Sequence, residues 1–303
     1  MKKKLVVLLG PTGVGKTELS LHIARRLQCP ILSADSRQLY RDMYIGTAAP
    51  TPEQLACARH YFVGTLALDD YYSAACYEEE AISLLSRLFD THDSLLLTGG
   101  SMLYIDAVCN GIDEMPTVSD EVRKAVVAKY EQEGLAAVQQ ELQELDPEFY
   151  DKVDRNNPKR VIHAVEICRM TGRPYSEFRT NPRKERDFDI IKIGLNRPRE
   201  ELFERIGRRV DAMIADGLEE EARRLYPHRH LNSLNTVGYK EMFTYFDGTY
   251  TLPEAIEKIK RNTRVYAKKQ LTWFKRDNAI TWFSPDDMEA ILAHIDTCLG
   301  EGV

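Results

Sequence analysis

The sequence lacks any apolar run that approaches the roughly 20 residues a helix needs to cross a bilayer. Three lysines and a short apolar stretch stand near the start of the chain. The stretch is too brief for a signal peptide, and it leads into a glycine-rich motif without a small-residue cleavage site. We therefore expect a cytoplasmic protein, a monomer, with no membrane partner.

The six cysteines form no C-x-x-C pair and show none of the Cys/His spacings typical of a zinc site. Reduced thiols in a cytosolic protein account for them, and no zinc is expected. Internal repeats and low-complexity segments are also lacking. The 303 residues, 43% of them hydrophobic, suffice for one large domain or for a core domain with an insertion.

An overall positive charge is lacking too, because the formal net charge is −6. This excludes a protein that is basic over its whole surface. Charge is nevertheless uneven, since basic residues outnumber acidic ones over 155–186 and stand without any acid over 258–276. The second segment holds Lys258, Lys260, Arg261, Arg264, Lys268, Lys269, Lys275 and Arg276. Such local basic surfaces suit a polyanion that docks in one place.

Short apolar runs alternate with helical patterns in the first hundred residues, which predicts an α/β fold with a parallel sheet. We expect strands at 5–9, 31–34, 61–63 and 94–98, with helices at 15–27 and 71–89 between them. Further strands are expected at 189–195 and 280–283, and helices at 199–215, 218–225, 237–245, 253–275 and from 285 onwards.

Three successive helical patterns without strands, at 119–130, 135–145 and 157–170, predict a helical insertion. We place it at 113–186, inside an α/β core made of 1–112 and 187–303 that ends in a helical C-terminal part.

The strongest motif matches G-x-x-x-x-G-K-[ST], follows an expected strand and opens an expected helix, as a P-loop does. Its residues are Gly10, Pro11, Thr12, Gly13, Val14, Gly15, Lys16 and Thr17. Glycines let successive N–H groups point at one anion, and the helix N-terminus adds its positive dipole end. Lys16 supplies a full charge, and the Thr17 hydroxyl can hold Mg²⁺. The motif leaves open whether the phosphates belong to ATP, GTP or an organic diphosphate.

Two polar segments follow expected strands at the edge where ligands bind in open α/β sheets. Asp35 can hold Mg²⁺, accept a proton from a nucleophile, or simply cap a turn. Ser36, Arg37 and Gln38 follow it, the last two with forked donors suited to a base edge or a phosphate. Ser101, after Gly99-Gly100, can cap the next helix or reach into the same crevice.

GPTGVGKT, DSRQLY with IGTAAP at 45–50, GGSMLY, TVGYKE at 236–241 and YAKKQLTWF at 266–274 occur in this order along the chain. Together they resemble the tRNA dimethylallyltransferase family over nearly the whole sequence. The eukaryotic members carry a C-terminal zinc finger that is not seen here, so the resemblance is to the bacterial type. It implies a P-loop fold with a helical insertion.

The resemblance implies that the P-loop binds dimethylallyl diphosphate and that N6 of the adenosine at position 37, next to the tRNA anticodon, attacks the allylic carbon. Pyrophosphate then leaves, stabilised by Lys16, the loop amides and Mg²⁺. Asp35 becomes the general base. Thr12 bridges substrate and pyrophosphate, and Arg209 reaches the diphosphate.

The tRNA contacts that the resemblance implies are Asp35 to Gln38, Ser101, Arg123, Lys159, Arg160, Val161, Ile162 and His163. A pocket for the swung-out base is expected as well. His163 and Lys269 stand where the family usually has arginine, which weakens a phosphate contact at either place.

Two other functions remain open on the sequence. A small-molecule or nucleotide kinase would use the same P-loop and Asp35, with 169–186 as its lid, but it does not predict DSRQLY, GTAAP or TVGYKE. A nucleic-acid-binding NTPase would need a Walker B strand ending in Asp, and the 94–98 strand ends in Thr-Gly instead.

Overall fold

The computed structural model describes residues 2–180 and 183–300. The chain divides into two units, one made of residues 1–109 and 185–303 and the other of residues 110–184. The expected insertion at 113–186 therefore begins three residues late and ends two residues late. Each unit has its own apolar core.

A six-stranded sheet forms the centre of the first unit, in the order β3-β2-β4-β1-β5-β6 with every pair parallel. Its strands are β1 (Lys3–Leu9), β2 (Ile31–Ala34), β3 (His60–Tyr61), β4 (Ser94–Gly99), β5 (Phe188–Leu195) and β6 (Ile280–Phe283). The α/β class is confirmed. The expected strand at 61–63 is wrong beyond Tyr61, because Phe62 adopts a left-handed φ of 63° that cannot continue a strand.

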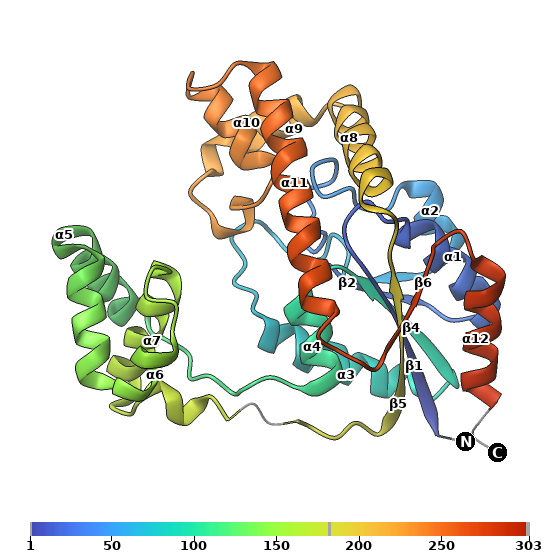
Figure 1. Cartoon of the computed structure of the whole chain (residues 1–303), viewed down its shortest axis with the longest axis horizontal. Coiled ribbons are helices and arrows are strands. Elements are labelled where there is room, and N and C mark those ends of the chain that lie inside the picture. The colour runs from blue at the N-terminus through green and yellow to red at the C-terminus, as the bar shows by residue number, and fades with distance from the viewer. Residues whose placement is uncertain (1, 181–182, 301–303) are drawn as a thin grey trace. The chain divides into compact units, whose positions relative to one another are not determined.

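Helices cover both faces of this sheet, which explains why its strands are apolar runs rather than alternating patterns. Figure 1 shows α1 (Lys16–Leu27) and α12 (Met288–Gly300) on one face, and α3 (Ala74–Phe89) and α4 (Met102–Asn110) on the other. The short helix α2 (Pro52–Cys57) was not expected. It begins at a reciprocal cap between Thr51 and Gln54 with a proline in its first turn.

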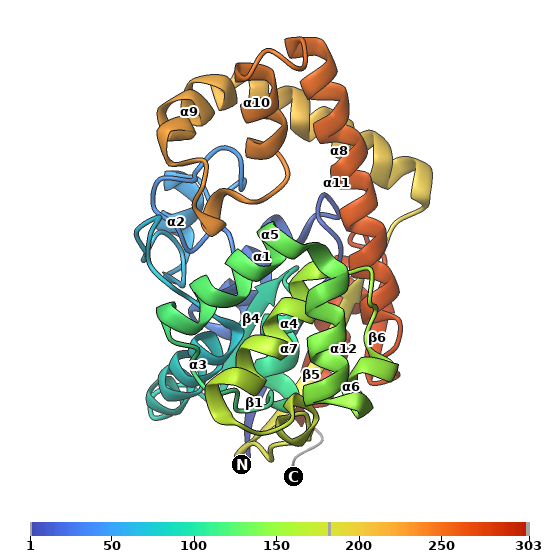
Figure 2. The same cartoon turned by 90° about the vertical axis from the view of Figure 1, so that its left-hand side faces the viewer.

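Four further helices stand beyond the carboxyl ends of the strands (Figures 1 and 2): α8 (Arg199–Ala215), α9 (Leu218–Leu225), α10 (Tyr239–Phe246) and α11 (Leu252–Phe274). The bounds of α8 and α9 are those expected from the sequence. A capping box between Thr251 and Glu254 fixes the start of α11. This layer faces the edge of the sheet where ligands bind.

The second unit is helical, with α5 (Asp120–Leu145), α6 (Pro147–Lys152) and α7 (Pro158–Thr171) around a core that includes Val126, Leu142 and Val161. Gly134 has non-helical angles inside α5, so the two expected helices are present as segments on either side of it. Helix α6 was not expected. The Asp146 side chain, which accepts the Phe149 N–H, caps its start.

Candidate active site

The P-loop joins β1 to α1 and is shaped by glycines that no other residue can replace. Gly10, Gly13 and Gly15 have φ values of 152°, 81° and 115°. A Cβ on Gly10 would stand 2.7 Å from the Leu195 carbonyl oxygen, and one on Gly13 would stand 2.9 Å from the Ile206 side chain. Positive φ and close packing together require glycine. Pro11 and Val14 of the loop are buried.

Lys16 folds back onto this loop. Its Nζ donates to the carbonyl oxygens of Gly10 and Pro11, both at 2.9 Å. Burial and, to a smaller extent, the charge of Arg209 lower the pKa of Lys16 to about 7, against the opposite effect of the Asp35 charge. An anion on the loop would favour the charged form, so Lys16 is placed to respond to a bound phosphate.

Asp35 follows β2 and caps a turn, which is one of the roles that the sequence allowed. Its Oδ1 accepts the N–H groups of Arg37 at 2.9 Å and Gln38 at 3.3 Å, which fixes the turn. The residue also lines the cavity described below. The Ser101 hydroxyl accepts the Ser36 N–H at 2.8 Å, so it supports this same turn.

The two forked side chains after Asp35 are tied to the protein. Arg37 Nη1 donates to the Asn232 and Ser233 carbonyl oxygens at 3.1 and 2.9 Å. Gln38 Nε2 donates to the carbonyl oxygens of Thr47 and Ala48. The Gln38 amide therefore holds the 47–48 loop.

Glu221 organises the segment 44–46, and sequence reasoning missed it. Its carboxylate accepts the N–H groups of Tyr44, Ile45 and Gly46 at 2.8–3.0 Å, and the Tyr239 hydroxyl at 2.7 Å. A Cβ on Gly46 would stand 2.5 Å from the Tyr239 ring, which explains that glycine. One glutamate in an acidic helix start gives no signal of this role, because its partners lie about 176 residues away.

Gln270 is a second residue that sequence reasoning missed, although it lies within the quoted 266–274 motif. Its side chain is 2% exposed. Oε1 accepts the Thr12 N–H at 2.9 Å, and Nε2 donates to the Gly100 carbonyl oxygen at 2.8 Å. Helix α11 thus joins the P-loop to the turn after β4. Gly100 allows the close approach of this side chain, since a Cβ there would stand 2.4 Å from Gln270 Nε2.

These segments line one cavity of about 920 Å³ in the first unit. Thr12, Lys16, Asp35 and Arg209 all face it. Arg209 is not a solvated surface arginine, because burial lowers the pKa of its guanidinium, while the charge of Asp35 acts in the opposite direction. Apolar side chains line the same cavity, among them Met213, Val237 and Val265, and burial raises the pKa of Tyr266 to about 12. The cavity can therefore hold an anion and an apolar group together.

The remaining predicted tRNA contacts belong to the second unit. Lys159, Arg160 and His163 are exposed on α7, and Ile162 is half-buried. The prediction for Val161 is wrong as far as its side chain is concerned, because Val161 is fully buried in the core of this unit. Glu166 lies 3.9 Å from Arg123 Nε and 3.4 Å from His163 Nδ1.

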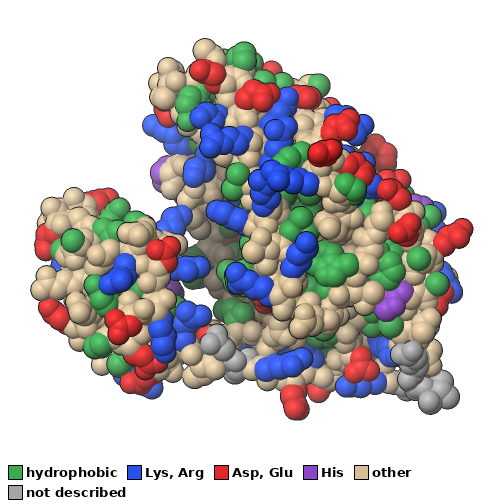
Figure 3. Space-filling view, in the orientation of Figure 1, with side chains coloured by type: hydrophobic (Ala, Val, Ile, Leu, Met, Phe, Trp, Pro, Cys, Tyr) green, Lys and Arg blue, Asp and Glu red, His purple; other side chains and the backbone are tan. Residues whose placement is uncertain are grey.

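The basic segment 258–276, most of it in α11, contains no acidic residue, but acidic side chains from outside the segment pair with one of its lysines. Lys260 pairs with Asp211 at 2.8 Å and with Glu257 at 3.2 Å. Figure 3 shows Lys and Arg side chains gathered along the path of α11 all the same. Over 2–180 and 183–300, no three His, Cys, Asp or Glu side chains form a metal-binding group, and no helix is long and apolar enough to span a membrane. Thr17 is exposed at the start of α1.

Comparison with known proteins places this geometry among enzymes that act on tRNA. The model of the IPP transferase family matches residues 38–277. The chain is 66% identical over 291 residues to tRNA dimethylallyltransferase 2 of Parabacteroides distasonis, covering 96% of this chain and 97% of that protein. It is 60% identical to tRNA dimethylallyltransferase 1 of Bacteroides fragilis, covering 98% and 99%.

Two solved structures are also similar. The tRNA isopentenylpyrophosphate transferase of Bacillus halodurans has a TM-score of 0.73 and 36% identity, with 99% of this chain and 98% of that one covered. A eukaryotic dimethylallyltransferase acting on tRNA has a TM-score of 0.76 and 25% identity, with 90% and 70% covered.

Proposed function

Because this chain belongs to the IPP transferase family, we propose that the P-loop cavity is where it transfers a dimethylallyl group to tRNA. The chain is a transferase that modifies tRNA, and the kinase alternative is not favoured. The donor in this proposal is dimethylallyl diphosphate, and the acceptor is N6 of the adenosine at position 37.

The observation that carries the proposal is the meeting of Lys16, Arg209 and Asp35 on one cavity with apolar walls. The diphosphate lies on the P-loop, where backbone N–H groups, Lys16 and Arg209 receive it. The dimethylallyl group lies against the apolar side chains. The cations face the atom that gains negative charge when the bond to carbon breaks.

The reaction needs a base as well as a leaving-group site. As N6 forms its bond to the allylic carbon, the carbon–oxygen bond breaks and its electron pair departs with pyrophosphate. Asp35 takes the proton that N6 loses, so the product amine is neutral. Thr12, whose N–H is held by Gln270, keeps its hydroxyl at the boundary between the two substrates.

Mg²⁺, when bound, supplies further positive charge to the leaving pyrophosphate. The exposed Thr17 hydroxyl at the start of α1 fits this role, because it adjoins the loop that receives the phosphates. Thr17 alone makes a weak site, so phosphate oxygens would complete the coordination.

For tRNA, we propose contacts from the 35–38 turn and Ser101 in the first unit, and from Arg123, Lys159, Arg160 and His163 in the second. The basic side chains of α11 would meet the phosphate backbone. In this proposal the enzyme is cytoplasmic and monomeric. The anticodon loop is single-stranded, and its target base swings out of the loop into the cavity.

The test is a transfer assay with Mg²⁺, labelled dimethylallyl diphosphate and an unmodified tRNA whose anticodon loop carries an A-A-A run. We expect label in the tRNA with the wild type and almost none with Asp35→Asn, which keeps the Oδ1 acceptor for Arg37 and Gln38 but loses the base. ATP hydrolysis without label transfer would reject the proposal.

A further inference from the structure

We propose that Arg205 is a second diphosphate-binding arginine. Its side chain is held beside the P-loop by a hydrogen bond to a loop carbonyl, and Arg197 binds the nearby carboxylates that could otherwise pair with it. The inference rests on the proposed function, because it concerns the same diphosphate site. It adds a third cationic side chain to Lys16 and Arg209 at that site.

The position of Arg205 on α8 directs it to the loop. It lies four residues before Arg209, so both side chains leave the same face of the helix, and both line the cavity. Arg205 Nε donates to the Gly13 carbonyl oxygen at 3.1 Å. Its Nη2 lies 3.9 Å from where a Cβ of Gly15 would stand. The outer edge of this guanidinium therefore lies at the Gly13–Gly15 turn, where the loop curls toward an anion.

Arg197 takes up the two carboxylates that could otherwise neutralise this edge. Its two Nη atoms donate to the two oxygens of Asp286, each at 2.6 Å, and Nη1 also pairs with Glu201. Its Nε donates to the Val14 carbonyl oxygen at 3.0 Å. The bond to Arg197 lowers the pKa of Asp286, and the charge of Arg205 adds a smaller effect in the same direction. Asp286 is thus close enough to Arg205 for an electrostatic effect, but its hydrogen bonds go to Arg197.

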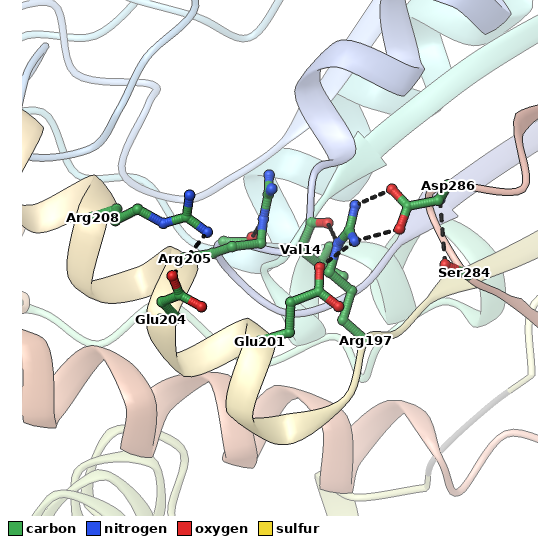
Figure 4. Close-up of polar contacts among 9 residues, drawn as sticks. Val14, Arg197, Glu201, Glu204, Arg205, Arg208, Ser284 and Asp286 are labelled. Atoms are coloured by element: carbon green, nitrogen blue, oxygen red, sulfur yellow. Dashed lines mark hydrogen bonds and ion pairs between the residues drawn. The ribbon is translucent and has the colours of Figure 1, made fainter.

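Figure 4 shows the result of this arrangement. The Arg197 guanidinium faces Asp286, whereas Arg205 projects separately with its outer nitrogens joined to no carboxylate. Among the described residues, Arg205 forms no ion pair. Its neighbour Arg208 has a partner, Glu204, at 3.5 Å, but both of these side chains are largely exposed.

Charge balance explains why such a group would bind the diphosphate. A pyrophosphate leaving group carries several negative charges on two phosphates, and a forked guanidinium can donate two hydrogen bonds to one of them. Lys16 and Arg209 supply two cations. Arg205 supplies a third from the Gly13–Gly15 side of the loop, so that the anion is approached from more than one direction.

A purely structural role is the competing explanation, because the bond to Gly13 alone could brace the loop. Three variants separate the two roles. Arg205→Gln removes the charge, and Arg205→Lys keeps the charge but loses the fork. Arg223→Gln is the matched control, since it removes an exposed arginine that pairs with Glu219 on α9 and does not line the cavity.

The measurement is calorimetric binding of inorganic pyrophosphate with Mg²⁺ at two salt concentrations, with anticodon stem-loop binding and thermal unfolding measured beside it. We expect Arg205→Gln to weaken pyrophosphate binding about 10- to 100-fold and to lower its salt dependence. Arg205→Lys should lie between it and the wild type. Stem-loop affinity should stay within about twofold, and Arg223→Gln should match the wild type in both ligands.

Two results would overturn the proposal. One is pyrophosphate binding by Arg205→Gln within about twofold of the wild type. The other is an equal loss of pyrophosphate and stem-loop binding together with a lower melting temperature, which would show that Arg205 only braces the loop. Neither readout needs the transfer reaction, so a wild type that transfers no label would reject the proposed function without deciding this one.

Discussion

The two units hold their candidate functional residues in different ways. In the first unit, Thr12 and the segment 44–46 are fixed by side chains that lie far along the chain, Gln270 and Glu221. In the second, Lys159 and Arg160 stand exposed on α7 above a small apolar core. Changes in the first unit should therefore spread through the cavity, whereas changes on α7 should stay local.

The largest effect should come from Asp35. Asp35→Asn should lower the transfer rate about 100- to 10,000-fold, because the amide cannot accept the N6 proton. Pyrophosphate affinity should change little, since the turn keeps its acceptor. Asp35→Ala loses that acceptor as well, and we expect it to weaken stem-loop binding in addition. Single-turnover rates with both variants check this. A transfer rate near wild type for Asp35→Asn, with a loss only for Asp35→Ala, would mean that the carboxylate matters only as a turn cap.

Gln270→Leu should be the next largest change, and it acts on stability. It leaves the Thr12 N–H and the Gly100 carbonyl oxygen buried without partners, which should cost about 2–4 kcal/mol in the free energy of unfolding. Urea denaturation measures it, with the exposed Thr272→Leu on the same helix as the control, expected within about 0.5 kcal/mol. A free energy of unfolding of Gln270→Leu equal to that of the wild type would show that the bonds from Gln270 to the P-loop and to Gly100 do not stabilise the fold.

A smaller effect concerns pH. The Lys16 pKa of about 7 lies below its unfolded value, so in the ligand-free protein Lys16 loses its proton as the pH rises through 7. If the charged form binds the phosphate, wild-type affinity for pyrophosphate should fall about fivefold from pH 7 to 8 relative to Lys16→Arg, whose guanidinium stays charged. Calorimetry at several pH values decides it. Parallel pH profiles for the two proteins would show that Lys16 titrates outside this range.

The smallest effect should come from α7. Lys159→Gln with Arg160→Gln should weaken tRNA binding about 3- to 10-fold, reduce its salt dependence and leave pyrophosphate binding unchanged. Lys152→Gln with Arg173→Gln removes the same charge from exposed residues paired with Glu148 and Glu177, and should leave both affinities near wild type. A loss of pyrophosphate affinity in the α7 variant would contradict the independence of the two units.

The sequence predicted what depends on neighbouring residues. Periodicity gave α8 and α9 their observed bounds, and the P-loop motif placed Lys16 against the end of β1. It could not predict Glu221 or Gln270, whose roles depend on partners far along the chain. The resemblance did not reveal that the Val161 side chain is buried, because motif position says nothing about which face of α7 is buried. The end of β3 before Phe62 could not be predicted, because it depends on the positive φ of Phe62, which no residue pattern indicates.

The order of strands in the sheet has a consequence for how the chain is made. The central strand β1 leaves the ribosome first, yet its partner β5 is synthesised some 185 residues later, after all of the second unit. Residue 270, which completes the P-loop, comes later still. Parallel pairing over such separations is slow. We therefore expect the nascent chain to fold 110–184 before its sheet is finished, so that the ability to bind a diphosphate arises only after residue 270 has been added.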